Sequence, residues 1–175
     1  MERLKYVRPA VIVLILTVLD QVSKYLAVTR LKFQSDYIFI DGLLSFTYHE
    51  NRGAAFGILQ GGRWVFVVFT VLLVGFICYY YISLPESRIN SALKASLTIV
   101  LAGALGNFID RFLNGFVVDF LQFEFINFPV FNLADVYVVC GTFAMGIFIV
   151  FFSKDENKPR YKAILNEKAT GKNDE

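Results

Sequence analysis

The chain contains four apolar runs, and each is close to the ~20 residues that a helix needs to cross the hydrocarbon core of a bilayer. Because 56% of the 175 residues are hydrophobic and 17% are aromatic, the composition fits one membrane domain better than several soluble modules. We therefore predict an α-helical polytopic membrane protein with a single membrane-embedded domain over 1–152 and a polar tail over 153–175. The predicted spans are about 7–28, 64–82, 91–111 and 135–152.

The distribution of Lys and Arg predicts the orientation of these spans, because cytoplasmic flanks favour cations. Eleven of the 17 Lys and Arg residues precede the first run, lie around the loop between the second and third, or follow the fourth. Both termini are therefore expected in the cytoplasm, with segments 29–63 and 112–134 outside it. The length of the first run and its lack of a small-residue cleavage pattern favour a retained helix over a secretory signal peptide.

The two extracytoplasmic segments contain β-favouring sequence. In the first, residues 37–40 and 44–48 are separated by Asp41-Gly42, a strong turn signal. In the second, residues 116–121 and then 123–130 are apolar, aromatic and typical of extended chain. We therefore predict a small sheet on the outer face of the membrane domain.

Polar side chains gather at those ends of the apolar runs that must share one side of the membrane. Ionisable groups in or beside a span cost roughly a few kcal/mol unless they are paired or hydrated, so their convergence indicates a functional site. The gathered residues are Asp20, Lys24, Asn51, Arg52, Asn107, Asp110, Arg111, Asn132 and Asp135.

Several of these residues have a purely structural interpretation beside the functional one. Asp20 and Lys24 stand at i and i+4, acid first, so they can form an ion pair that only fixes helix packing. Arg111 can pair with the neighbouring Asp110, or it can bind an oxyanion, a phosphate or a backbone carbonyl of a ligand. The small residues Ala102, Gly103, Ala104 and Gly106 allow another helix to approach the third span closely.

Two aspartates offer hydrolytic chemistry if they meet. Asp119 lies in an apolar strand-like run, where the alternative is an exposed strand residue. Asp135 opens the fourth span, where the alternative is a helix N-cap, although Asn132 serves that purpose equally well. Carboxylates held close together cannot both ionise, so one can accept a proton from water while the other donates one to a scissile bond. Two such carboxyl groups, one acting as acid and one as base, are the smallest set that can hydrolyse a peptide bond without a covalent intermediate.

Other hydrolytic sites fit the sequence less well. His49, the only histidine, belongs to no zinc-binding H-E-x-x-H pattern and is interpreted as a loop residue. Cys78 and Cys140 have no metal-type spacing and are interpreted as small core residues. No G-x-S-x-G nucleophile elbow is present. A zinc-dependent or serine-nucleophile mechanism therefore fits the sequence less well than a carboxylate pair.

Five motifs, in chain order across residues 20–135, resemble those of lipoprotein signal peptidase, also called signal peptidase II, a bacterial aspartic peptidase family. Their shared order makes the resemblance specific, although each motif alone is a weak signal. Ala102 stands where the family often has glycine, and the charged tail lies outside the resemblance. The motifs are Asp20-x-x-x-Lys24, Asn51-Arg52-Gly53-Ala54-Ala55-Phe56-Gly57, the run from Gly103 to Arg111, Val117-Val118-Asp119-Phe120 and Phe131-Asn132-Leu133-Ala134-Asp135.

The resemblance implies an activity and a fold. Asp119 and Asp135 correspond to the catalytic pair of an aspartyl protease in the cell membrane. The implied substrate is a prolipoprotein whose cysteine carries diacylglycerol and which is cut just before that cysteine. The implied fold has four transmembrane helices, a small extracytoplasmic β-sheet called a cradle, and a short external helix. Residues at positions that support the site or contact substrate are Asp20, Lys24, Asn51, Gly53, Asn107, Asp110, Arg111 and Asn132.

The resemblance also implies that globomycin inhibits the protein and that membrane lipids are partners, whereas no metal, cofactor or nucleic acid is required. We further expect the stretch from Gly53 to Gly57 to form a movable cover near the site, because glycines at both ends permit such motion.

Two alternatives belong to other functional classes. A small transporter or channel subunit would line an ion path with charged residues through the whole membrane depth, yet the inner halves of these spans are nearly uncharged. A noncatalytic membrane scaffold would keep the fold and bind lipidated substrate without cutting it. Asn substitution of the aspartates distinguishes the scaffold from the peptidase.

Overall fold

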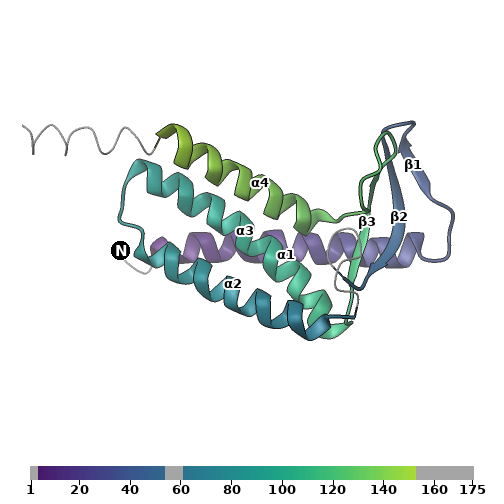
Figure 1. Cartoon of the computed structure of the whole chain (residues 1–175), viewed down its shortest axis with the longest axis horizontal. Coiled ribbons are helices and arrows are strands. Elements are labelled where there is room, and N and C mark those ends of the chain that lie inside the picture. The colour runs from purple at the N-terminus through teal and green to yellow at the C-terminus, as the bar shows by residue number, and fades with distance from the viewer. Residues whose placement is uncertain (1–3, 54–60, 153–175) are drawn as a thin grey trace, which may run out of the picture.

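The computed structural model of the chain describes residues 4–53 and 61–152. Figure 1 shows its helices running side by side as a bundle, with a small sheet standing across one end. Residues 32–53, 61–62 and 114–132 contain no short external helix, and 54–60 lie outside the described residues, so that helix stays a prediction. The elements are α1 (Leu4–Leu31), β1 (Tyr37–Ile40), β2 (Leu44–Asn51), α2 (Arg63–Ser83), α3 (Arg88–Leu113), β3 (Val117–Phe123), α4 (Leu133–Ile147) and the π-helical turn η2 (Phe148–Phe152).

Within the described residues, four helices are long and apolar enough to cross a membrane, and their bounds lie within a few residues of the predicted spans. The longest, α1, has 28 residues and therefore extends ~42 Å, beyond the ~30 Å of a hydrocarbon core. Its last turns reach the sheet, where Ala27 packs against Val118 and Phe120 of β3. The end of α1 therefore ties the bundle to the sheet.

The helix α3 lies at the centre of the bundle. Half of its membrane span is buried inside the protein, whereas the corresponding shares for the other three spans are 22%, 17% and 11%. Glycines allow the close contacts: a Cβ built at Gly106 would lie 2.5 Å from Asp20 Oδ2 of α1, and one at Gly103 would overlap the Ala134 carbonyl of α4. The small residues of the third span thus admit both α1 and α4, as their spacing predicted.

The predicted sheet is present and antiparallel, with strand order β1-β2-β3. The turn after β1 contains Gly42 at φ 68°, in the left-handed region that glycine adopts without strain. β2 continues past the predicted residue 48 to Asn51, and its last residues pair with β3 so that His49 lies opposite Asp119. The antiparallel register therefore brings the end of β2 beside Asp119.

The predicted extended chain over 123–130 is wrong, because β3 ends at Phe123 and residues 124–127 form a turn. The ring of Phe123 lies 5.0 to 5.9 Å, centroid to centroid, from the rings of Phe125, Phe128 and Phe131. Aromatic enrichment, which is typical of strands, here produces a cluster of rings around a turn.

The interpretation of Cys78 and Cys140 as core residues is also wrong, because both are free and exposed on the helix surfaces. In a membrane span, the side that faces lipid is as apolar as the side that faces other helices. Hydropathy alone therefore does not distinguish the two sides.

The two glycines of α4 provide a test of helix packing. A Cβ built at Gly141 would lie 2.7 Å from Val100 Cγ2 and 3.0 Å from the Ser96 carbonyl, whereas one at Gly146 would meet nothing within 4 Å. Gly141→Leu should therefore destabilise the protein by roughly 1–3 kcal/mol through overpacking, seen as a lower thermal midpoint in detergent. Gly146→Leu is the matched control and should leave the midpoint unchanged; equal midpoints for both variants would contradict the packing described.

Candidate active site

The structure brings Asp119 and Asp135 to one asparagine. Asn132 Nδ2 donates to Asp119 Oδ1 at 2.6 Å, and the backbone N–H of Asn132 donates to Asp135 Oδ2 at 3.1 Å. Asn132 is fully buried and Asp119 is 1% exposed, whereas Asp135 is half-buried. Two carboxylates that lie far apart along the chain thus share one buried partner.

The start of α4 explains how this arrangement forms. Asn132 is the N-cap and accepts from the backbone N–H of Asp135 at 3.0 Å, while Asp135 accepts from the backbone N–H of Asn132. This reciprocal capping box satisfies two N–H groups that the first helical turn leaves unpaired. Asn132 is therefore the N-cap, and the alternative that Asp135 is the N-cap is wrong: Asp135 is the N3 residue of the capping box, and its other oxygen accepts from Asn107.

Two further asparagines bind the remaining carboxylate oxygens. Asn51 Nδ2 donates to Asp119 Oδ2 at 2.9 Å, and Asn107 Nδ2 donates to Asp135 Oδ1 at 2.7 Å. The side-chain oxygen of Asn51 accepts from the backbone N–H of Gly53 at 3.0 Å, which fixes the direction of its amide. Each oxygen of the two aspartates thus has a defined donor, and this fixes how both carboxylates are oriented.

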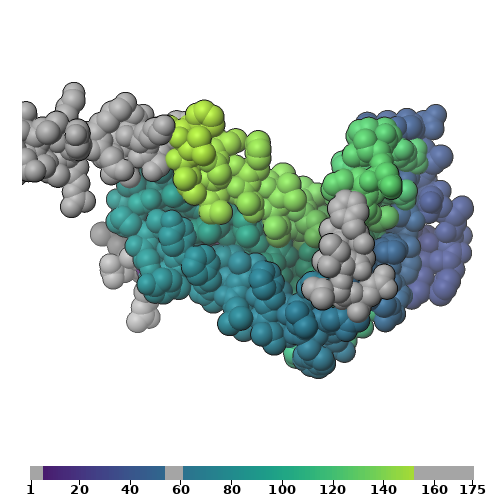
Figure 2. All heavy atoms as spheres, viewed as in Figure 1, coloured from purple at the N-terminus to yellow at the C-terminus, as the bar shows by residue number. Residues whose placement is uncertain are grey.

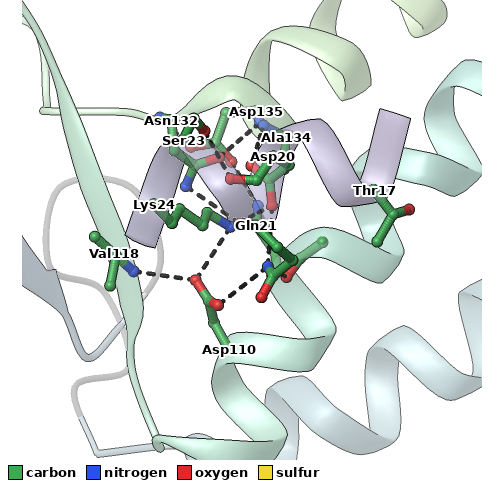
Figure 3. A network of polar contacts seen from close by, with 12 residues as sticks. Thr17, Asp20, Gln21, Ser23, Lys24, Asp110, Val118, Asn132, Ala134 and Asp135 are labelled. Atoms are coloured by element: carbon green, nitrogen blue, oxygen red, sulfur yellow. Dashed lines mark hydrogen bonds and ion pairs between the residues drawn. The ribbon is translucent and has the colours of Figure 1, made fainter. Parts of the chain in front are cut away.

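A buried ionic cluster lies directly behind the two aspartates. Lys24 Nζ lies 2.9 Å from Asp20 Oδ2 and 3.1 Å from Asp110 Oδ2, so the predicted i, i+4 pair exists and has a third member. Lys24 Nζ also donates to Asn107 Oδ1 at 2.9 Å. Figure 3 shows the three charged side chains converging from α1 and α3. The lysine is thus one hydrogen-bonded residue away from Asp135.

Gln21 belongs to this cluster, although the sequence analysis did not single it out. Its Nε2 lies 3.2 Å from Asp20 Oδ2, 3.2 Å from Asp110 Oδ1 and 3.1 Å from the Gly106 carbonyl. A glutamine directly after an acid inside an apolar span is itself a polar residue that needs a partner. That placement was the available signal for its role.

Arg111 does not pair with its neighbour Asp110. Its guanidinium donates to the backbone carbonyl of Gly53 at 3.1 Å and lies 4.8 Å from the centroid of the Phe66 ring. Arg111 therefore binds a backbone carbonyl of the protein itself, and its contact with a ligand stays a prediction. Gly53 is described, but residues 54–57 of the expected cover lie outside the described residues.

The two aspartates, Asn51 and Arg111 line a cavity of about 450 Å³. The other lining residues are mostly apolar. The cavity lies where Figure 2 shows the surface hollowed between α4 and the sheet. The apolar lining consists of Phe123, Phe128, Pro129, Val130, Phe131, Val136, Val139 and Cys140.

The surroundings of Asp119 favour its protonated form. Burial and, to a smaller extent, the negative charge of Asp135 raise the pKa of this carboxyl to about 7, against the opposing effect of the Asn51 and Asn132 amides. Asp135 instead lies at the N-terminus of α4, where the helix dipole and a backbone N–H stabilise negative charge. A carboxyl with this pKa can carry a proton near neutral pH.

Within residues 4–53 and 61–152, no three His, Cys, Asp or Glu side chains are grouped so that they could hold a metal ion. The interpretation of His49 as a loop residue is wrong, because His49 lies on strand β2, where its side chain is exposed.

Known proteins resemble this chain over most of its length. The sequence profile of the family described as Signal peptidase (SPase) II matches residues 12–152. Lipoprotein signal peptidases of Streptococcus pyogenes serotype M5 (strain Manfredo) and serotype M18 (strain MGAS8232) are each 40% identical over 134 residues, which are 77% of this chain and 87% of theirs.

Two solved structures, each described as a bacterial membrane enzyme, have the same fold. One has a TM-score of 0.75 and 33% identity, covering 86% of this chain and 90% of its own. The other has a TM-score of 0.74 and 33% identity, covering 83% of this chain and 94% of its own. These matches confirm the resemblance carried by the five motifs. The chain belongs to the signal peptidase II family and is a multi-pass peptidase of the cell membrane.

Proposed function

We propose that the protein removes the signal peptide from diacylglyceryl-modified prolipoproteins, cutting before the lipidated cysteine. Its family and the names of its relatives support this substrate class. The observation that carries the proposal is the pair of carboxylates, Asp119 and Asp135, which share Asn132 at the wall of one cavity.

In this mechanism, Asp135 is the general base and Asp119 the general acid. Asp135 takes a proton from water while the water oxygen attacks the scissile carbonyl, and Asp119 gives its proton to the carbonyl oxygen. When the C–N bond breaks, Asp135 passes its new proton to the leaving amine and Asp119 recovers one from the hydroxyl of the intermediate. Both aspartates thereby return to their starting states, and one water is consumed for each bond cut.

The cavity suits a substrate that is both peptide and lipid. Its polar residues are positioned to act on the scissile bond, while the apolar wall, which includes Phe128 and Val139, can contact acyl chains. Membrane lipids and globomycin-type inhibitors are proposed to contact the same surfaces. No metal or cofactor is part of the proposed reaction.

The proposed orientation places both termini in the cytoplasm and the cavity near the extracytoplasmic face. The concentration of Lys and Arg in the terminal segments and in the loop between the second and third spans supports it. In this orientation the sheet and the two aspartates, Asp119 and Asp135, lie on the side where an exported precursor meets water.

Replacing either aspartate tests the reaction. Asp119→Asn and Asp135→Asn each remove a group that must transfer a proton, so each should lower the cleavage rate by about 10³-fold or more. Processing of a lipidated precursor by purified protein, followed as a gel shift with and without globomycin, measures the effect. Asp36→Asn is the control, because Asp36 is exposed and does not line the cavity. Cleavage that persists in either dyad variant would disprove the mechanism, while binding without cleavage in the native protein would favour the scaffold.

The pH dependence follows from the raised pKa of Asp119. A carboxyl with a pKa of about 7 is protonated below that pH and loses its proton above it. The acid form that the mechanism needs therefore disappears as pH rises, and kcat should fall tenfold per unit at pH well above 7. Rates measured from pH 5 to 9, with thermal midpoints recorded at each pH, separate this effect from unfolding. A constant kcat up to pH 9 would show that Asp119 is not the general acid.

Asn132→Ser separates helix capping from the contact with Asp119. Serine is a good N-cap, but it carries no amide to reach the Asp119 carboxylate. We expect cleavage to slow by about tenfold while the thermal midpoint falls less than in Asn132→Ala, which loses both the cap and the amide. If the two variants cleave and melt alike, the Asn132 amide has no role beyond capping.

A further inference from the structure

Two buried carboxylates each bind the backbone N–H that immediately precedes one aspartate of the pair. Asp20 Oδ1 accepts from Ala134 N at 2.9 Å, one residue before the α4 aspartate. Asp110 Oδ2 accepts from Val118 N at 3.2 Å, one residue before the β3 aspartate. The two elements that carry the catalytic pair are thus anchored at equivalent points.

The two anchoring carboxylates are linked to each other. Lys24 Nζ contacts Asp20 at 2.9 Å and Asp110 at 3.1 Å, and Gln21 Nε2 lies 3.2 Å from an oxygen of each. None of the three charged residues is more than 3% exposed. Figure 3 shows these side chains between α1, α3 and the start of α4, with the dashed contact to Val118 reaching β3. The anchors therefore form one cross-linked unit.

On the basis of the proposed function, we propose that Asp20, Gln21, Lys24 and Asp110, the anchoring cluster, set the separation of the two catalytic carboxylates, and that Gln21 is a positioning residue. Nothing in the proposed reaction requires these side chains to touch substrate. Two of them instead bind the backbone N–H groups of Ala134 and Val118, which directly precede Asp135 and Asp119.

The number of hydrogen-bond donors available to Asp20 and Asp110 explains why the cluster needs a glutamine. The three N–H groups of Lys24 are matched by Asp20, Asp110 and Asn107, so the ammonium has no donor left for Asp110 Oδ1. Gln21 supplies that donor. A neutral amide contacts both carboxylates without adding charge, and it therefore offsets the repulsion that remains when two acids share one lysine.

The separation matters because the proton balance of the pair depends on it. Repulsion between Asp119 and Asp135 weakens as their carboxylates move apart. If the anchoring cluster relaxes, β3 and α4 are free to separate, and the pKa of Asp119 should fall toward its usual range. The acid form would then be lost at a lower pH, and the displaced groups would be less well placed for attack.

Gln21→Met tests the inference, since Met has a similar length but no donor. Thr17→Val is the matched control, because Thr17 Oγ1 donates to the Ala102 carbonyl at 3.3 Å and joins the same two helices without contacting the cluster. Both full-length proteins are assayed in detergent with a peptide whose cysteine carries diacylglycerol. In Gln21→Met we expect kcat to fall by about tenfold, KM to stay within about twofold, and the basic limb of the kcat profile to move down by about half a pH unit. Thr17→Val should keep the native kcat and profile.

A native kcat and pH profile in folded Gln21→Met would overturn the inference, as would equal shifts in Thr17→Val. If thermal melting shows that Gln21→Met does not fold, Asp110→Asn decides. Its amide oxygen can still accept from Val118 N, but it loses the charge that binds Lys24, so the same downward shift is expected and an unchanged profile would overturn the inference. Different variants test the proposed function. Persistent cleavage in Asp119→Asn or Asp135→Asn would disprove that function, whatever the result for Gln21→Met.

Discussion

Lys24 carries the buried charge on which the arrangement of the other elements depends. An ammonium that is 3% exposed inside an apolar bundle must find a partner for every N–H, and Lys24 finds Asp20, Asp110 and Asn107. Two of these partners bind the backbone of α4 and β3 in turn, through Ala134 and Val118. Satisfying one cation on α1 therefore fixes α3, α4 and β3 relative to one another. The proposed chemistry at the cavity would then depend on an interaction outside the cavity.

In this bundle, close helix packing and the pairing of buried polar groups depend on each other. Gly106 has to lack a side chain because the Asp20 carboxylate occupies the space a Cβ would need. The local features were predictable: span length, small residues on the third span and the turn at Gly42 all follow from short stretches of sequence. The errors concern features that depend on distant neighbours. At the turn after Phe123, rings from several positions pack together. Cys140 is exposed rather than buried in the core, and hydropathy does not reveal this.

The sequence indicates which residues belong to the site better than it indicates which of them contact one another. Span topology placed the polar residues at one end, helical spacing predicted the Asp20–Lys24 pair, and the resemblance selected Asp119 and Asp135 as the proposed catalytic pair. The contacts between them join residues 68 to 114 positions apart in cases such as Asn51 with Asp119 and Asp20 with Ala134. No local pattern encodes such pairings. The position of Gln21 inside an apolar span indicated that it needs a partner, but not that the partner would be Asp110 on another helix.

Asp119 and Asp135 have identical side chains, but the strand and the helix that carry them place the two carboxylates in different surroundings. A strand uses its backbone N–H groups in the ladder with its neighbour, so Asp119 depends on the amides of Asn51 and Asn132, and burial dominates its pKa. The first turn of a helix has unpaired N–H groups and the positive end of a dipole, and Asp135 sits there. One acid placed on a strand and one at a helix start therefore differ in how well each bears negative charge. In the proposed mechanism, that difference decides which aspartate begins as the acid and which as the base.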